Sequence, residues 1–401
     1  MSHPRPMHRA LCPILAPLLA LLPACQDAAG PLAAPAGLDR CRESTAVGTP
    51  GVVSGSFIVR LRDGADGSAV AREHGIAPTA VFSEALDGFA GEIPAAARAA
   101  LASDPRIVSI EPDRIVTTSG RQIKAPWGLD RIDQTHIPLN STYNYSATGR
   151  GVTAYIVDSG IRLDHQLLDG RASVGYDGVG DGMNGWDCSG HGTHVAGIVG
   201  GWSTGVAKEV RLVSVRVFDA RNVGTLSGVI AGIDWVTANR RLPAVANLSF
   251  NAPPSAALDD AVQRMIASGV VAVVSAGNAG AAGAEDACGN SPARVADALT
   301  IGASDETDAR APWSNYGSCV DWFAPGAGIL SAGHSAPNAL AYASGTSMAA
   351  PFTAGVAALY LQKNPGASPR QVAEALRSGA NDRTVRNAAS ASDALLYSDI
   401  S

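Results

Sequence analysis

Aromatic and charged side chains are both scarce in this sequence. Aromatic residues make up 5% of the 401 residues and charged residues 16%, whereas apolar residues make up 46%. Such an apolar composition is typical of a globular protein with a large buried core. The length allows two or three domains. The formal net charge is −6 and no basic stripe is present. Nucleic acid is therefore excluded as an expected partner.

Long hydrophobic runs are also missing. The apolar stretch at 10–22 is too short to span a bilayer, and no later run reaches about 18 apolar residues. It follows two arginines and precedes small residues, which is typical of a signal peptide, here expected at 1–24. Residues 22–25 (LPAC) also resemble a bacterial lipobox, although Pro23 departs from that pattern. We expect export, either as a secreted protein or as a cell-envelope lipoprotein with a lipid anchor at Cys25.

A small α+β unit is expected at 54–119, after a linker at 25–53 that is rich in small residues, proline and glycine. Strand-like alternation and helical spacing follow one another along this unit. The expected strands are 56–61, 89–93 and 107–111, and the expected helices are 68–74 and 94–103.

The segment 120–401 is predicted to be an α/β domain. Near-continuous valine, isoleucine and leucine runs alternate with helical patterns, which is typical of a mostly parallel sheet covered by helices on both faces. Ligands bind beyond the carboxyl ends of the strands in such sheets. The expected strands are 152–157, 210–217, 245–248, 270–274 and 298–302, and the expected helices are 229–239, 257–268, 348–361 and 369–377.

Three motifs supply an acid, a base and a nucleophile. AYIVDSG puts Asp158 at the carboxyl end of a strand, GHGTHVAG puts His191 at a helix start, and GTSMAAP puts Ser347 at another. A serine hydroxyl needs an adjacent base to take its proton, and imidazole titrates near neutral pH. A carboxylate can hold the imidazole in the correct tautomer and stabilise its cation. The three residues together predict a catalytic triad.

The chain order Asp, His, Ser differs from that of chymotrypsin-like and α/β-hydrolase enzymes. The serine motif also lacks the second glycine of a Gly-x-Ser-x-Gly elbow, which argues against a lipase or esterase. Taken singly, Asp158 can be a helix cap, His191 a structural histidine and Ser347 an N-cap. His191 and His194 form a possible metal pair, but no glutamate lies between them as in a His-Glu-x-x-His zinc motif.

From Pro126 to the C-terminus the chain resembles the subtilase superfamily of serine endopeptidases, in particular its proteinase K and aqualysin branch. APWGLDRI at 125–132 is similar to the mature N-terminus of that branch, and SAGN at 275–278 to the family's oxyanion-hole motif. The resemblance implies a subtilisin-like fold and peptide hydrolysis through an acyl-enzyme without a catalytic cofactor. It also implies that Asn278 donates to the oxyanion, where a plain turn residue is the alternative.

The resemblance further implies a cleft in which an extended polypeptide substrate pairs with two segments of the enzyme. Where relatives have glycines after residue 250, this chain has NAPP at 251–254, so side chains there are expected to narrow the pocket before the scissile bond. The implied cleft residues are Asn222, Val223, Gly224, Ser249, Phe250, Asn251, Ala276 and Gly277.

The small unit resembles the inhibitor-type propeptide of subtilisins through GFAG at 88–91 and DPRIV at 104–108. This resemblance implies a prepro-enzyme that processes itself and keeps its propeptide as an intramolecular inhibitor and chaperone. An unrelated small domain is the alternative for this unit. For the whole chain, the alternatives are a catalytically inactive binding protein and a precursor whose active product is the small unit. A monomer is expected.

Structural calcium is implied at the carboxylate of Asp321, with the backbone carbonyls of Ala296 and Ala298 as further oxygen ligands. An ordinary surface aspartate is the alternative reading of Asp321.

The cysteines divide unevenly. By resemblance, Cys288 and Cys319 form a disulfide, which an exported protein can keep. Relatives pair the cysteine before the catalytic histidine with one at the position of Ala220, so Cys188 is expected to be a free thiol. Cys25 and the other two cysteines precede the peptidase segment and are expected to be absent from the mature enzyme.

Overall fold

The computed structural model describes residues 52–114, 120–278 and 283–399. The predicted signal peptide, Cys25, nearly all of the linker and the junction at 115–119 lie outside these residues. No helix within the described ranges is long and apolar enough to cross a membrane. The small and the large unit are each described by themselves.

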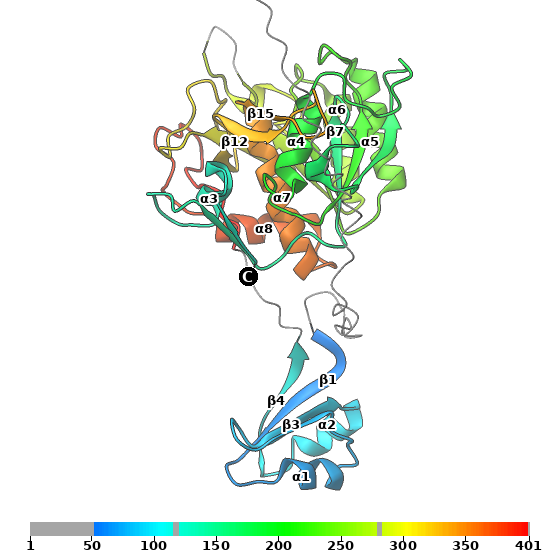
Figure 1. Cartoon of the computed structure of the whole chain (residues 1–401), viewed down its shortest axis with the longest axis vertical. Coiled ribbons are helices and arrows are strands. Elements are labelled where there is room, and N and C mark those ends of the chain that lie inside the picture. Colours follow the sequence, from blue (N-terminus) through cyan, green and yellow to red (C-terminus); the bar gives the residue numbers. More distant parts are fainter. Residues whose placement is uncertain (1–51, 115–119, 279–282, 400–401) are drawn as a thin grey trace, which may run out of the picture. The chain divides into compact units, whose positions relative to one another are not determined.

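The small unit is a four-stranded antiparallel sheet with two helices (Figure 1, blue to cyan). The three predicted strands and both predicted helices are present, and one further short strand was not predicted. Val59, Leu61 and Phe89 point from the sheet into a core that also holds Val70 and Leu101 of the two helices. Because one cluster contains residues of both helices, both pack on the same face of the sheet. In sheet order the strands are β2 (Ala80–Phe82), β3 (Gly88–Glu92), β1 (Val52–Leu61) and β4 (Ile107–Arg114), and the helices are α1 (Gly67–Glu73) and α2 (Ala95–Leu101).

The large unit is built on a seven-stranded parallel sheet, which confirms the predicted α/β class. The interior strands are rich in valine, and every residue of β7, β10, β11 and β12 is buried, because helices cover both faces. In sheet order the strands are β13 (Trp322–Pro325), β12 (Leu299–Ser304), β11 (Val270–Ser275), β10 (Ala244–Leu248), β7 (Thr153–Asp158), β9 (Arg211–Arg216) and β8 (Ala172–Asp177).

Two apolar cores lie on the two faces of this sheet. One contains buried residues of α4 (His191–Gly200), α7 (Thr346–Lys363) and α8 (Pro369–Gly379). The other contains buried residues of α5 (Leu226–Asn239) and α6 (Ala256–Ala267). Figure 1 shows α7 and α8 in orange and α5 in green. α4 and α7 pack against each other, which brings two of the predicted catalytic elements together.

Smaller elements complete the large unit. A short helix, α3 (Trp127–Ile132), precedes the sheet. The hairpins are β5 (Gly120–Ile123) with β6 (Thr142–Tyr145) and β14 (Ile329–Ala332) with β15 (Leu340–Ala343). Two short 3₁₀ helices are η2 (Gln166–Leu168) and η3 (Ala287–Gly289).

A C-terminal segment, residues 394–398, lies along the edge strand β13 and reaches α3. Phe323 N donates to Ala394 O at 2.9 Å, Leu396 N donates to Phe323 O at 2.8 Å, and Ser398 N donates to Ile132 O at 2.7 Å. The segment therefore covers one open edge of the sheet.

Candidate active site

The three predicted triad residues sit at the ends of three elements. Asp158 is the last residue of β7, His191 is the first residue of α4, and Ser347 lies in the first turn of α7. This is the carboxyl edge of the parallel sheet, where such folds place their sites.

Asp158 and His191 form a hydrogen-bonded pair in which the aspartate is buried and the histidine is partly exposed. Oδ1 of Asp158 lies 2.8 Å from Nδ1 of His191, and the Ser159 N–H donates to the same oxygen at 2.7 Å. The Asp158 side chain is 1% exposed and that of His191 27%. Oδ2 of Asp158 has no hydrogen-bond partner within the described chain. Binding through Nδ1 leaves Nε2 of His191 for proton exchange.

The pKa of His191 is raised above its ordinary value. Burial by itself lowers this pKa, but the charge and hydrogen bond of Asp158, with the charge of Asp187, outweigh burial. The imidazolium is therefore stabilised in the place where a base must take up a proton.

Ser347 is held by a reciprocal contact with Ser249. Its Oγ donates to the carbonyl of Ser249 at 3.1 Å, and Ser249 Oγ donates to the carbonyl of Ser347 at 2.9 Å. Asn247 Nδ2 in turn donates to Ser249 Oγ at 2.8 Å. Within the described residues no hydrogen bond joins Ser347 to His191, so the hydroxyl must rotate for attack; catalytic contacts are often loose without substrate.

Asn278 is oriented by the residue before the nucleophile. Its Oδ1 accepts from Thr346 N at 2.8 Å and from Thr346 Oγ1 at 3.1 Å. With the carbonyl oxygen of the amide engaged, Nδ2 remains as the donor, and a Cβ built on Gly345 would lie 3.4 Å from it. The arrangement can present an N–H group to an oxygen that develops negative charge.

The two predicted cleft segments follow the strands that flank β7. Residues 222–224 are exposed, and Asn222 Oδ1 accepts from Ser189 Oγ at 2.6 Å. At the other segment, Asn251 lies over Gly277: a Cβ on that glycine would meet Asn251 Nδ2 at 2.8 Å. Ser275 Oγ also donates to Asn251 Oδ1 at 3.3 Å. Asn251 therefore fills space beside the wall that Ala276 and Gly277 form.

The calcium prediction meets an arginine. Asp321 Oδ2 accepts from Thr300 N at 2.8 Å, and Oδ1 pairs with the guanidinium of Arg377. Both carboxylate oxygens thus have protein partners, while Ala298 is buried and Ala296 exposed. As arranged, this donor set does not fit a cation. The Arg377 side chain is 62% exposed, so it can withdraw into solvent.

His194 is excluded as a metal partner of His191. Its Nε2 lies 3.1 Å from the carbonyl oxygens of both Ile329 and Ala341, which bridges β14 and β15. Burial lowers its pKa to about 4, so the ring is neutral at physiological pH. Across the described ranges no group of three or more His, Cys, Asp or Glu residues is placed to hold a metal.

Cys288 and Cys319 are joined by a disulfide, the pairing that the resemblance implies. Cys188 is a half-buried free thiol three residues before His191.

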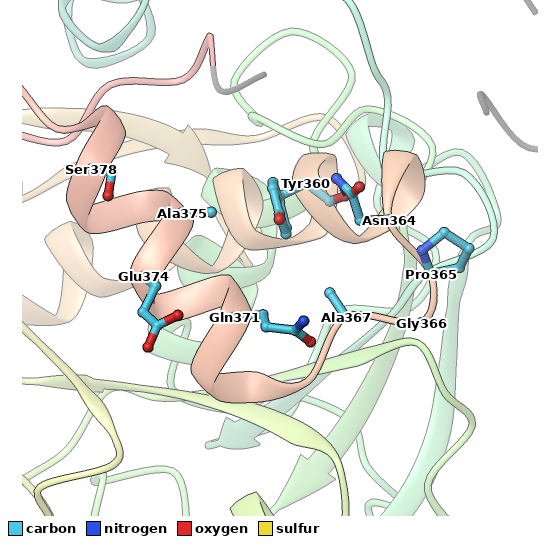
Figure 2. A pocket seen from close by; sticks show the side chains of 9 residues that line it. All are labelled: Tyr360, Asn364, Pro365, Gly366, Ala367, Gln371, Glu374, Ala375 and Ser378. Atoms are coloured by element: carbon cyan, nitrogen blue, oxygen red, sulfur yellow. Dashed lines mark hydrogen bonds between the residues drawn. The ribbon is translucent and has the colours of Figure 1, made fainter. Parts of the chain in front are cut away.

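A hollow lies away from the triad, at the far end of α7 (Figure 2). It measures about 560 Å³ and is lined by the last turn of α7, the connecting loop and α8. An 18-residue helix is about 27 Å long, and Ser347 is in its first turn. Glu374, which supplies a carboxylate to this hollow, pairs with Arg370 on the same helix. The hollow therefore takes no part in the chemistry.

A serine, a histidine paired with a buried aspartate and an oriented amide group lie at one sheet edge, an arrangement that suits a serine-type endopeptidase. The sequence comparisons then give the family. Residues 149–393 match the Subtilase family, and the chain belongs to this family.

Among its relatives, an extracellular serine proteinase of Thermus sp. (strain Rt41A) is 51% identical over 316 residues, which cover 79% of this chain and 76% of that protein. Alkaline serine exoprotease A of Vibrio alginolyticus is 47% identical over 324 residues, 79% of this chain and 60% of that protein. A crystal structure of a cold-adapted subtilisin-like serine proteinase superposes with a TM-score of 0.67 at 48% identity, covering 69% of this chain and all of that one. The predicted branch within the family stays a prediction.

Sequence reasoning missed the residues that support the triad. Thr346 lies inside the recognised GTSMAAP motif, and Asp187 lies three residues before GHGTHVAG. Thr346 donates to Asn278, and Asp187 accepts from the first turn of α4. Their position in or near a recognised motif was the signal that the sequence offered. Their hydrogen-bond partners could not be predicted, because these depend on how the loops fold.

Proposed function

We propose that the chain hydrolyses peptide bonds with Ser347 as nucleophile, His191 as general base and then acid, and Asp158 as the group that orients and charges the histidine. Ser347 Oγ attacks the scissile carbonyl carbon while His191 Nε2 takes its proton. The proton then passes to the leaving amine, and an acyl-enzyme remains. Water, activated by the same histidine, releases the second product. Asn278 Nδ2 and the Ser347 N–H donate to the oxyanion.

The observation that carries this proposal is the buried Asp158–His191 pair with its raised histidine pKa. A merely structural histidine loses its charge on burial, as His194 does. His191 is instead held so that gaining a proton is favoured, which is what a base in acyl transfer requires.

The test is covalent labelling of the mature enzyme with an organophosphonate, followed by peptide mass analysis. We expect one adduct on Ser347 and complete loss of hydrolysis. The Ser347→Ala precursor must take up no label and must show no activity, whereas Ser344→Ala, at an exposed serine just before α7, serves as the matched control. Labelling without turnover of any peptide would instead support an inactive binding protein of the same fold.

We further propose that substrate binds as an extended strand between residues 222–224 and 249–251, against the wall of Ala276 and Gly277. Asn251 reduces the space beside Gly277, so small residues before the scissile bond are favoured. Asn251→Gly tests this: the preference for large over small residues at that position, measured as a ratio of kcat/KM, is expected to rise about 10-fold, because even one methylene group in a pocket is worth about 1–3 kcal/mol.

We also propose export and self-processing. The names of the relatives, an extracellular proteinase among them, support secretion. Residues 1–24 would be removed as a signal and the unit at 54–119 as a propeptide. Intact mass and N-terminal sequencing of exported material test both cleavages, and a mass increase on Cys25 would identify the lipoprotein form.

Calcium at Asp321 is proposed to require withdrawal of Arg377, after which the carbonyls of Ala296 and Ala298 complete the ligands. Burial raises the pKa of Asp321 in spite of its contacts with Arg377 and Thr300, so these partners do not fully compensate the buried charge. Arg377→Ala is expected to enlarge the rise in melting temperature on calcium addition, and Asp321→Ala to abolish it. Equal responses of all three proteins would contradict the proposal.

A further inference from the structure

A second buried carboxylate lies beside the catalytic pair. Asp187 precedes α4 and is 1% exposed. Its Oδ1 accepts from Ser159 Oγ at 2.9 Å, Ser189 N at 2.9 Å and Gly190 N at 2.8 Å. Its Oδ2 accepts from Thr193 N at 2.8 Å and from the hydroxyl of the same residue at 2.6 Å. No lysine or arginine pairs with it in the described part of the chain, so these neutral donors alone compensate its charge.

Ser159 joins this carboxylate to the loop of the catalytic acid. It follows Asp158 directly and is completely buried. Its N–H donates to Asp158, its hydroxyl donates to Asp187, and the same hydroxyl accepts from Gly192 N at 3.0 Å. One serine thus links the end of β7 to the first turn of α4, the two segments that bear the acid and the base.

The two segments have no room to move toward each other. A Cβ on Gly192 would lie 2.1 Å from the carbonyl oxygen of Gly160 and 3.2 Å from the Asp158 Cβ. A buried carboxylate is costly unless every oxygen is hydrogen-bonded, so Asp187 and its five donors form an arrangement that resists distortion. A negative charge at the N-terminus of the ten-residue helix α4 is also favoured by the helix dipole.

We propose that Asp187 is a positioning residue for the peptidase reaction: through Ser159 and the first turn of α4 it holds His191 against Asp158, and its buried charge stabilises the imidazolium. This inference rests on the proposed catalytic roles of Asp158 and His191. It assigns Asp187 no contact with substrate.

The charges around His191 are consistent with this role. Asp158 on β7 and Asp187 before α4 are the negative groups, and both raise the pKa of His191 against the opposing effect of burial. His194 on the same helix is neutral because burial lowers its pKa to about 4. His334, in the loop between β14 and β15, lies against the glycine that precedes His191.

Two variants separate the two parts of the proposal in the full-length chain after maturation. Ser159→Ala removes the bridging hydroxyl but keeps the charge, so kcat is expected to fall about 10- to 100-fold with KM and the acid limb of the pH profile unchanged. Asp187→Asn removes the charge as well, so kcat falls and the acid limb of kcat/KM moves to lower pH by about half a unit or more. Because the charge is buried, this shift must persist in 1 M salt.

Asp164→Asn is the matched control, since Asp164 is an exposed carboxylate on the neighbouring loop; its profile must match the wild type. Wild-type kcat in Ser159→Ala overturns the positioning role. An unmoved acid limb in Asp187→Asn overturns the electrostatic role. If Asp187→Asn does not mature, the result for Ser159→Ala alone decides the proposal. Either result counts only if the wild-type enzyme is active in the same assay. Failure of the Ser347 labelling test would instead remove the proposed function itself.

Discussion

His191 links activity to pH at the scale of single residues. It acts as a base when neutral, so kcat/KM rises with pH through a pKa that the structure places above the ordinary value of 6.5. Replacing Asp158 by Asn removes the larger of the two raising charges. We expect Asp158→Asn to move the acid limb to lower pH and to reduce kcat by about 10³- to 10⁴-fold, because the amide also favours the wrong tautomer.

The measurement is a pH profile of kcat/KM for both proteins on one peptide substrate. The sign for stability is the opposite of that for activity. A histidine with a raised folded-state pKa stabilises the fold below pH 6.5, and this contribution is lost as pH rises through the folded pKa. An acid limb that stays in place in Asp158→Asn would show that another group titrates there.

Cys188 is expected to give the one thiol of the mature chain. The structure leaves it reduced, half-buried and three residues from His191, while Cys288 and Cys319 are paired. Titration of the denatured, unreduced mature enzyme should find one thiol. Mercurials should inhibit the native enzyme, because a bulky adduct on Cys188 would disturb the loop that leads into α4. Cys188→Ser should relieve that inhibition. Finding no thiol, or three, contradicts this assignment.

For single residues, the sequence predicted the residues that carry the chemistry better than the residues that hold them in place. The order of the motifs that contain Asp158, His191 and Ser347 is by itself enough to narrow the class of enzyme. Arg377 could not be predicted as the partner of Asp321, because it lies 56 residues further along the chain on a separate helix. Only the folded chain brings the two side chains together.

At the scale of elements, α4 packs closely at Gly192 against the loop that follows β7. Alanine usually stabilises a helix relative to glycine, by about 1 kcal/mol. Here a Cβ would lie 2.1 Å from a backbone oxygen, so Gly192→Ala is expected to cost about 1–3 kcal/mol of stability and most of the activity. Gly366→Ala, where a Cβ meets nothing within 4 Å, is the control. Thermal melts of inhibitor-blocked enzyme test the stability, and an unchanged melt would refute the clash.

The disulfide closes the loop that runs from η3 to just before β13. Its cysteines are 31 residues apart, and on the chain-entropy model such a closure stabilises by about 3–4 kcal/mol. The double variant Cys288→Ser/Cys319→Ser should lose that much free energy of unfolding, measured with urea on inhibited enzyme. Cys188→Ser should not change it. Equal stability of all three proteins would show that the loop is held by its other contacts.

Elements with strong local signals were predicted to within a few residues. β11 and α5 are examples, since an unbroken valine run and a long apolar helix face identify them. β2, β14 and β15 were missed, because strands of three or four residues carry too little periodicity to be recognised. They form by pairing with neighbours that the sequence does not specify locally.

For the whole molecule, maturation gives the decisive prediction. If the enzyme cuts its own junction, full-length Ser347→Ala must accumulate as an unprocessed precursor, while Ser344→Ala matures normally. Gel mobility and N-terminal sequencing of exported protein are sufficient measurements. Processing of Ser347→Ala in a host without other proteases would contradict self-cleavage.

The fold class could be predicted because the runs of buried apolar residues alternate with helices along the chain. The strand order could not, because β7 lies between β10 and β9, which come much later in the sequence. The positions of Asp158 and His191 relative to each other follow from that order. The motifs alone therefore predicted which residues take part in the site but not how those residues are arranged in space.

The C-terminal segment 394–398 bears on how well the enzyme resists cleavage by other copies of itself. A peptidase that grips extended chains attacks frayed ends and bare strand edges first. This segment covers the edge at β13 and is itself tied to α3 through Ser398 and Ile132. The backbone of β13 at this edge is therefore already paired. We expect this pairing to reduce cleavage of the sheet edge by other copies of the enzyme.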